Sequence, residues 1–166
     1  MNYLLPGVTG YCIDEYPTPW RFPTVSYVIF KTLCHTAGRM MNARVRMVEQ
    51  QLYCNFWVCY FSSIQPNRKY VILANDSYPF LAFCQMPMGL KEGEQGFEPF
   101  SSKPFIEPPE LKEAFRQVSD WIIVPLDVLT MPVASADMSR LNVFERRMVK
   151  HFETERVGDI IFNCYD

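Results

Sequence analysis

One segment of this chain is apolar on both of its faces, and it constrains the fold more than any other feature. The segment YCNFWVCYFSSI, residues 53–64, carries aromatic, aliphatic or cysteine side chains at odd and even positions alike. Successive side chains of a strand point to opposite faces of a sheet. A strand that is apolar on both faces needs cover on both sides, which predicts a central strand.

The segments on either side predict further strands joined by short turns. Residues 43–52 open with alternating basic and apolar side chains, which is typical of a strand with one exposed face. Residues 69–74 and 80–86 are apolar runs, and turn-forming residues such as Pro, Asn and Asp precede each of them. Consecutive strands with short connections predict an antiparallel meander.

The rest of the chain predicts two irregular segments, two further extended segments and a helix. Proline and glycine interrupt residues 1–23, so these predict an irregular N-terminal segment. The β-branched and aromatic run 24–33 predicts a strand, with a short helix as the alternative. Residues 87–108 predict a long exposed loop, after which a Pro-Pro pair opens a helix. Residues 120–126 predict a short buried strand or extended segment.

Residues 137–166 predict a C-terminal helical region, with Asp137 or Ser139 as its cap. Its apolar stripe consists of Leu141, Phe144, Met148 and Phe152. The last ten residues, VGDIIFNCYD, carry a second, shorter apolar stripe. Two stripes in a row predict a helical hairpin or one bent helix lying on the sheet. The apolar end then belongs to the core, and docking of this end into a partner is the alternative.

Together these segments predict a single α+β domain over residues 1–166, since the length is that of one domain. We expect an antiparallel meander sheet of about four to five strands. The C-terminal helices are expected to cover one face of this sheet.

The six cysteines predict buried free thiols in a cytoplasmic protein. The first residues, MNYLLP, lack the basic start and the long apolar run of a secretory signal. Without export, thiols stay reduced, and most of these cysteines sit in apolar runs, where cysteine behaves as a small hydrophobe. No apolar run approaches the roughly 18 residues of a membrane span. We therefore expect a soluble protein without disulfides or membrane attachment.

Motifs for catalysis, metal binding and phosphate binding are weak in this sequence. It has two histidines and no Cys-x-x-Cys pair, so converging zinc ligands are not indicated. No cysteine has the local surroundings of an activated nucleophile, and no glycine-rich phosphate loop is present. Asp159 is placed to accept a hydrogen bond from Arg156 or a loop, although a helix-surface acid is the simpler interpretation. We predict no metal, no cofactor and no catalytic residue.

The charge pattern argues against nucleic acid as the partner. The net charge is −2 and the isoelectric point is about 5.7, the wrong sign for a phosphate-binding chain. One stretch, residues 17–48, is nevertheless purely basic and contains Arg39, Arg44 and Arg46. Nucleic-acid binding through these arginines is therefore kept as a minor hypothesis.

Aromatic residues in loop-like segments give the main functional prediction. Aromatics and arginine dominate the energetics of protein interfaces. The residues predicted to bind a partner are Trp20, Arg21, Phe22, Phe97 and Phe100. We expect a non-enzymatic protein-interaction module, such as an accessory subunit, an assembly factor or an immunity-type inhibitor. Its ligand is expected to be another protein.

A small-molecule-binding domain or enzyme is the alternative hypothesis. An α+β domain can enclose an apolar pocket between its sheet and its helices. The residues predicted to line such a pocket are Arg44, Arg46, Tyr53, Trp57 and Tyr60. In this hypothesis Arg44 or Arg46 fixes an anionic group, and Cys59 lies beside the aromatic side chains.

Overall fold

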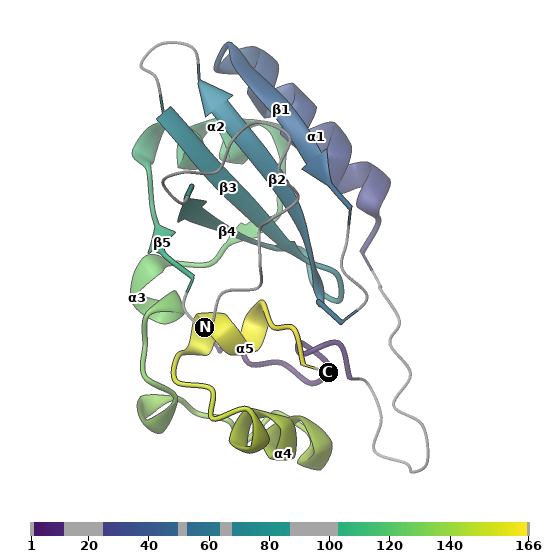
Figure 1. Ribbon diagram of the computed structural model, residues 1–166, viewed down its shortest axis with the longest axis vertical. Helices are drawn as coiled ribbons and strands as arrows, with labels where there is room; N and C mark the ends of the chain where they lie inside the picture. The colour runs from purple at the N-terminus through teal and green to yellow at the C-terminus, as the bar shows by residue number, and fades with distance from the viewer. Residues whose placement is uncertain (1, 12–24, 50–52, 64–67, 87–102, 166) are drawn as a thin grey trace.

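The computed structural model describes residues 2–11, 25–49, 53–63, 68–86 and 103–165 of the chain. It shows an antiparallel sheet with helices on both sides and several helices later in the sequence, as Figure 1 shows. The predicted single α+β domain with a meander sheet is thus confirmed. Within the described residues, no helix is long and apolar enough to cross a membrane.

The sheet follows the order of the chain. Its strands are β1 (Ala43–Val48), β2 (Phe56–Ser63), β3 (Arg68–Asn75), β4 (Phe80–Gln85) and β5 (Phe105–Ile106), each antiparallel to the next. A sixth short strand, β6 (Ile122–Ile123), pairs parallel with β4. Strand β5 lies inside the region 87–108 that was predicted to be a loop, whereas β6 lies where a short strand was predicted.

Two helices cover one face of the sheet. These are α1 (Tyr27–Met40) and α2 (Pro109–Val118). The prediction of a strand over residues 24–33 is therefore wrong, and the alternative of a helix is correct. Phe30, Leu33, Cys34 and Ala37 recur at helical spacing and are buried. The helical spacing of these residues continues well beyond residue 33, so the ten residues 24–33 were too few to show it.

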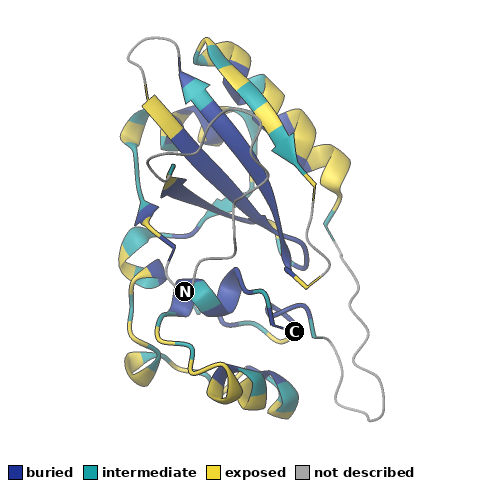
Figure 2. Cartoon of the chain, viewed as in Figure 1, coloured by how far each residue is buried: buried dark blue, intermediate teal, exposed yellow. Residues whose placement is uncertain are grey.

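The C-terminal part of the chain covers the opposite face. Its elements are α3 (Leu126–Leu129), the 3-10 helix Val133–Ser135, α4 (Val143–His151) and α5 (Val157–Ile161). Helix α5 lies next to the sheet, and α4 lies farther from the sheet than α5 does (Figure 1). Figure 2 shows the same difference in burial, since α5 is mostly buried and α4 is largely exposed.

Strand β2 has the two apolar faces that its sequence predicts. Trp57, Cys59 and Phe61 belong to the core shared with α1 and α2. Phe56, Val58 and Tyr60 belong to the core on the other side, which includes α5 and the N-terminal residues. The sheet is therefore the middle layer of the molecule.

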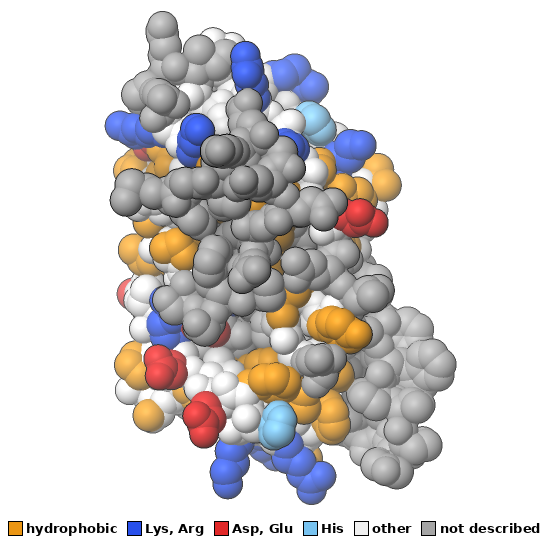
Figure 3. Space-filling view, in the orientation of Figure 1, with side chains coloured by type: hydrophobic (Ala, Val, Ile, Leu, Met, Phe, Trp, Pro, Cys, Tyr) orange, Lys and Arg blue, Asp and Glu red, His pale blue; other side chains and the backbone are white. Residues whose placement is uncertain are grey.

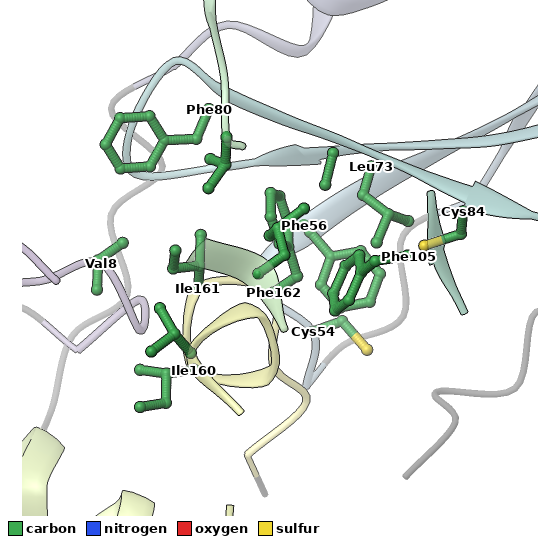
Figure 4. Packing of buried hydrophobic residues seen from close by; sticks show 14 of the residues in the cluster. Val8, Cys54, Phe56, Leu73, Phe80, Cys84, Phe105, Ile160, Ile161 and Phe162 are labelled. Carbon is green, nitrogen blue, oxygen red and sulfur yellow. The ribbon is translucent and has the colours of Figure 1, made fainter. Parts of the chain in front are cut away.

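The C-terminal residues are core, as predicted. Ile160, Ile161 and Phe162 are fully buried. Figure 4 shows them packed beneath the sheet among Phe56, Phe80 and Val8. The predicted helical hairpin corresponds to two separate helices, α4 and α5. A capping box made by Asn142 and Glu145 starts α4, so the predicted caps Asp137 and Ser139 are wrong.

A disulfide bond joins the C-terminal segment to the start of β2. Cys54 and Cys164 are bonded although 110 residues separate them in the chain. The expectation that the cysteines are free is wrong for this pair, because their proximity arises only from the tertiary fold. Cys34, Cys59 and Cys84 are free and buried, in agreement with the sequence. Cys12 lies outside the described residues.

Buried asparagines fix both ends of the chain to one end of the sheet. The side-chain amides of Asn55 and Asn75 each donate to the carbonyl oxygens of Val8 and Ile161. The backbone N–H of Asn163 donates to Asn55 Oδ1 over 2.8 Å. Because these groups satisfy buried backbone polar atoms, the N-terminal residues and the tail pack without a strand of their own.

Candidate interaction surface

The first turn of α1 exposes three consecutive apolar side chains. Tyr27 is 37% exposed, Val28 69% and Ile29 50%. The buried face of the helix begins only at Phe30. Single exposed apolar residues are ordinary, but consecutive ones on a soluble surface usually indicate a contact site. We call Tyr27, Val28 and Ile29 the α1 patch.

Aromatic packing anchors the first turn of α1 on the sheet through Tyr27 and Phe30. The Tyr27 ring meets the Trp57 ring edge-on, with centroids 5.7 Å apart. Phe30 stacks on Trp57 at 6.1 Å and on Trp121 at 6.2 Å. Burial, followed by the nearby Cys59 and Cys34 thiols, raises the pKa of Tyr27, so its hydroxyl stays neutral at neutral pH. A preorganised aromatic base of this kind lowers the entropy lost on binding.

Basic side chains surround the border between α1 and β1. Four of them are exposed, namely Lys31 and Arg39 on α1, and Arg44 and Arg46 on β1. Among the described residues, none of the four forms an ion pair with an acid. Figure 3 shows Lys and Arg side chains at the end of the molecule where α1 joins β1. This border therefore carries positive charge that no described carboxylate neutralises.

The residues predicted from the loops cannot be placed on this surface. Trp20, Arg21, Phe22, Phe97 and Phe100 all lie outside the described residues. The first three precede the α1 patch closely in the sequence. The α1 patch itself was not among the predicted partner-binding residues, because a strand over residues 24–33 would have alternated its side chains between two faces. The helical spacing of the same residues is the signal that would have identified the α1 patch.

The predicted pocket residues are spread over both faces of the sheet. Arg46 lies over the Tyr60 ring, 4.7 Å from its centroid, and Arg44 is exposed farther along the same strand. Trp57 is on the opposite face, against α1. Tyr53 precedes β2 and is 57% exposed. The structure thus brings Arg46 and Tyr60 together and separates this pair from Trp57.

A largely buried ionic cluster joins the start of β5 to α5, and only its Asp159 stood out in the sequence. Lys103 Nζ is 3.3 Å from Asp159 Oδ1, and Arg156 Nε donates to Asp159 Oδ2 over 2.8 Å. The Lys103 side chain is 4% exposed, and its ammonium lies 5.6 Å from the Phe56 ring centroid. Arg156 bonds Asp159, which is the alternative to the simpler interpretation as a helix-surface acid. The second partner, Lys103, comes from the region predicted to be a loop.

Burial dominates the electrostatics of this cluster. It lowers the pKa of Lys103, although the charge of Asp159 partly opposes this effect. Burial also raises the pKa of the nearby Cys84 thiol to about 12, which keeps it protonated and unreactive at neutral pH. Two cations share one carboxylate, so the cluster has a surplus positive charge. An amine with a lowered pKa is the type of group that reacts with carbonyl compounds.

Comparisons with known proteins add nothing to these geometric observations. No protein-family model, curated protein or solved structure matches this chain. Within the described ranges, no three His, Cys, Asp or Glu side chains are grouped as metal ligands. The functional interpretation therefore depends on the surface of α1 and β1 and on the cluster around Lys103.

Proposed function

We propose that this protein is a non-enzymatic interaction module that binds another protein through the outer side of α1. An accessory subunit, an assembly factor and an immunity-type inhibitor are all modules of this kind. The observation that supports the proposal is the α1 patch, in which consecutive apolar side chains are exposed on a rigid aromatic base.

The α1 patch has the composition of an interface core. Complete burial of a valine or isoleucine side chain contributes about 1.5–3 kcal/mol, and Val28 and Ile29 are at least half exposed in the free protein. A partner that covers both therefore gains about 1 kcal/mol from each. Tyr27 adds a fixed ring with a neutral hydroxyl, and Lys31, one turn further along α1, supplies an exposed charge beside it.

Affinity capture from native extract tests this proposal. The bait is the full chain, and the variant is the double substitution Val28→Asp with Ile29→Asp. Acids are favourable in the first turn of a helix, so the variant is expected to fold normally. Val143→Asp is the matched control, because Val143 is 55% exposed in the first turn of α4.

We expect the wild type and the control to recover the same partner in stoichiometric amount. The double variant should retain about a tenth of it or less, the loss expected when two apolar contacts are replaced by charges. Thermal unfolding of all three proteins verifies that they are folded. Recovery of no stoichiometric partner by the wild type, or equal recovery by the double variant, would contradict the proposal.

A small-molecule-binding or enzymatic function is a second candidate, and the Lys103 cluster favours it. The lowered pKa of Lys103 increases the fraction of neutral, nucleophilic amine. The test is reductive trapping with a small aldehyde, followed by peptide mapping of the modified lysines. Preferential labelling of Lys103 over the exposed Lys31 and Lys150 supports this candidate. Labelling of only the exposed lysines counts against it.

A further inference from the structure

Strand β1 forms one edge of the sheet. Among the described strands it pairs with β2 alone, so no described strand covers its outer side. The hydrogen bonds between β2 and β3 determine which N–H and C=O groups of β1 face β2 and which face outward. Asp76 N–H donates to Asn55 O over 2.9 Å, and the same register aligns Trp57 with Ala74 and Cys59 with Ile72. Hydrogen-bonded pairs alternate in an antiparallel ladder, so the odd-numbered residues of β2 bond to β3.

The even-numbered residues of β2 consequently bond to β1. Tyr60 is aligned with Arg46, and Ser62 with Arg44. The backbone groups of Arg44 and Arg46 therefore face β2, and those of Val45 and Met47 face outward. Among the described residues, none donates to or accepts from these outward groups. We call the outward N–H and C=O groups of Val45 and Met47 the β1 edge.

The side chains next to the β1 edge are basic on both sides of the sheet. Arg44 and Arg46 are exposed on the face that carries Tyr60. On the other face, Gly38 contacts Val45 so closely that a Cβ there would lie 2.4 Å from Val45 Cγ2. Lys31 is seven residues before Gly38 and so shares its side of the helix. Lys31 therefore borders the strand from the α1 side.

We infer that the β1 edge binds an extended acidic segment of a partner protein as an added strand. This inference rests on the proposed interaction function and specifies how the partner is held. Open edges accept strands through main-chain hydrogen bonds, and side chains at alternate positions provide specificity. Acidic residues at alternate positions of the partner segment lie beside Arg44 and Arg46, where their charges are complementary. The intervening residues are small or apolar and lie towards Val45, Met47 and α1.

The same charges argue against a second copy of this chain as the occupant. An antiparallel pair of β1 strands would bring the arginines of one copy next to those of the other. Like charges on neighbouring strands are destabilising, and charged edges are a known means of preventing self-association. The edge therefore repels its own copy and attracts an acidic strand.

The test is binding of a fluorescent peptide to the full chain, measured by anisotropy at low salt. The probe alternates Glu and Val, and a peptide that alternates Lys and Val is its control. The charge variant is Arg44→Glu with Arg46→Glu. Its matched control is Arg147→Glu with Lys150→Glu, which makes the same change of charge on the exposed side of α4.

A backbone variant separates strand addition from charge attraction alone. Met47→Pro removes an outward N–H, and proline is tolerated on the open side of an edge strand. Hydrogen exchange measures whether the peptide protects the amides of Val45 and Met47. Thermal unfolding identifies any variant that is not folded. If Met47→Pro does not fold, the hydrogen-exchange result on the wild type decides the test.

We expect the charge variant and Met47→Pro each to weaken binding of the Glu-Val peptide by about tenfold or more. The α4 control should stay within about twofold, and the Lys-Val peptide should not bind. Unchanged binding by the charge variant would overturn the inference. Binding without protection of the two amides, or tighter binding of a mixed-sequence oligonucleotide at this site, would also overturn it.

The two proposals fail in different ways. If native capture succeeds and the Arg44→Glu, Arg46→Glu variant recovers the partner fully, the edge inference is wrong and the interaction function stands. If the peptide binds the β1 edge and native capture recovers nothing, the binding mode stands without evidence for a natural partner, and the proposed function fails.

Discussion

Gly158 shows how tightly α5 is packed against the chain around it. A Cβ at this position would lie 2.5 Å from Phe105 Cε2 and 2.7 Å from the backbone oxygen of Leu129. We predict that Gly158→Ala lowers the free energy of unfolding by about 1–3 kcal/mol, because a backbone atom cannot rotate away. Gly38→Ala should cost less, since its contact is the side chain of Val45 on the half-exposed β1. Urea unfolding of both variants measures the difference, and equal stabilities would contradict it.

Lys103 provides a second prediction at the scale of one residue. Burial places its folded-state pKa below its unfolded-state pKa. Between these two pKa values the unfolded chain therefore binds more protons than the folded chain. The free energy of unfolding contributed by this group therefore rises as pH increases from the folded pKa towards the unfolded pKa of about 10.4. Below the folded pKa the destabilising contribution is constant.

Replacing the charge with an apolar group of similar length should remove this dependence. Lys103→Met leaves Asp159 bonded to Arg156, so we expect stability at neutral pH to be unchanged or higher. Asp159→Asn should instead lower it by about 3 kcal/mol, because the buried Lys103 and the partly buried Arg156 then lose their carboxylate. Urea unfolding between about pH 7 and pH 10 measures both effects. A parallel pH dependence in wild type and Lys103→Met would show that another group causes it.

At the scale of elements, substitutions at the start of α4 compare the stability contributed by the observed cap with that contributed by a predicted one. Asn142 Oδ1 accepts from Glu145 N–H, and the fully buried Glu145 carboxylate accepts from Asn142 N–H and from Thr9. We predict that Asn142→Ala costs about 1 kcal/mol. Glu145→Ala should cost about 3 kcal/mol, because it also leaves the buried donors of Thr9 unsatisfied. The control, Asp137→Ala, should change the denaturant midpoint very little.

The elements that could be predicted from sequence are those whose patterns are local. The predicted strands 43–52, 69–74 and 80–86 overlap β1, β3 and β4, and the two-sided pattern of residues 53–64 correctly indicated a central strand. Helix α1 was mispredicted because β-branched and aromatic residues fill its first turns. Thr32 and Thr36 are accommodated there by hydroxyl bonds to the carbonyls four residues earlier. The helix buries its apolar side against the sheet, and this tertiary packing outweighs the local preference.

The candidate site could be predicted from sequence only in part. The basic character of residues 17–48 was evident, and it includes Arg44 and Arg46 beside the β1 edge. The open backbone of Val45 and Met47 depends on which strand ends the sheet, and sequence reasoning treated residues 24–33 as a further strand. Lys103 and Asp159 are 56 residues apart, so their contact exists only in the folded molecule. Local patterns contain no information on such a pair.

At the scale of the whole molecule, the disulfide and the apolar tail make different contributions to one structure. The bond between Cys54 and Cys164 closes most of the chain into a loop, since its ends are 110 residues apart. Restriction of the unfolded chain by such a loop contributes about 3–5 kcal/mol. The tail is also held by Phe162, which is fully buried, and by the hydrogen bonds of Asn163. These contacts do not require the covalent bond.

We therefore predict that reduction weakens the fold and that removal of the tail abolishes it. The Cys54→Ala, Cys164→Ala variant should unfold cooperatively with a free energy about 3–5 kcal/mol lower, and a reductant should have no further effect on it. A chain that ends at residue 156 loses α5 and leaves Phe56, Phe80 and Phe105 exposed, so it should show no cooperative thermal transition. Scanning calorimetry with and without reductant measures both. A truncated chain that melts like the double alanine variant would show that the disulfide alone, and not the packing of α5, accounts for the contribution of the C-terminal segment.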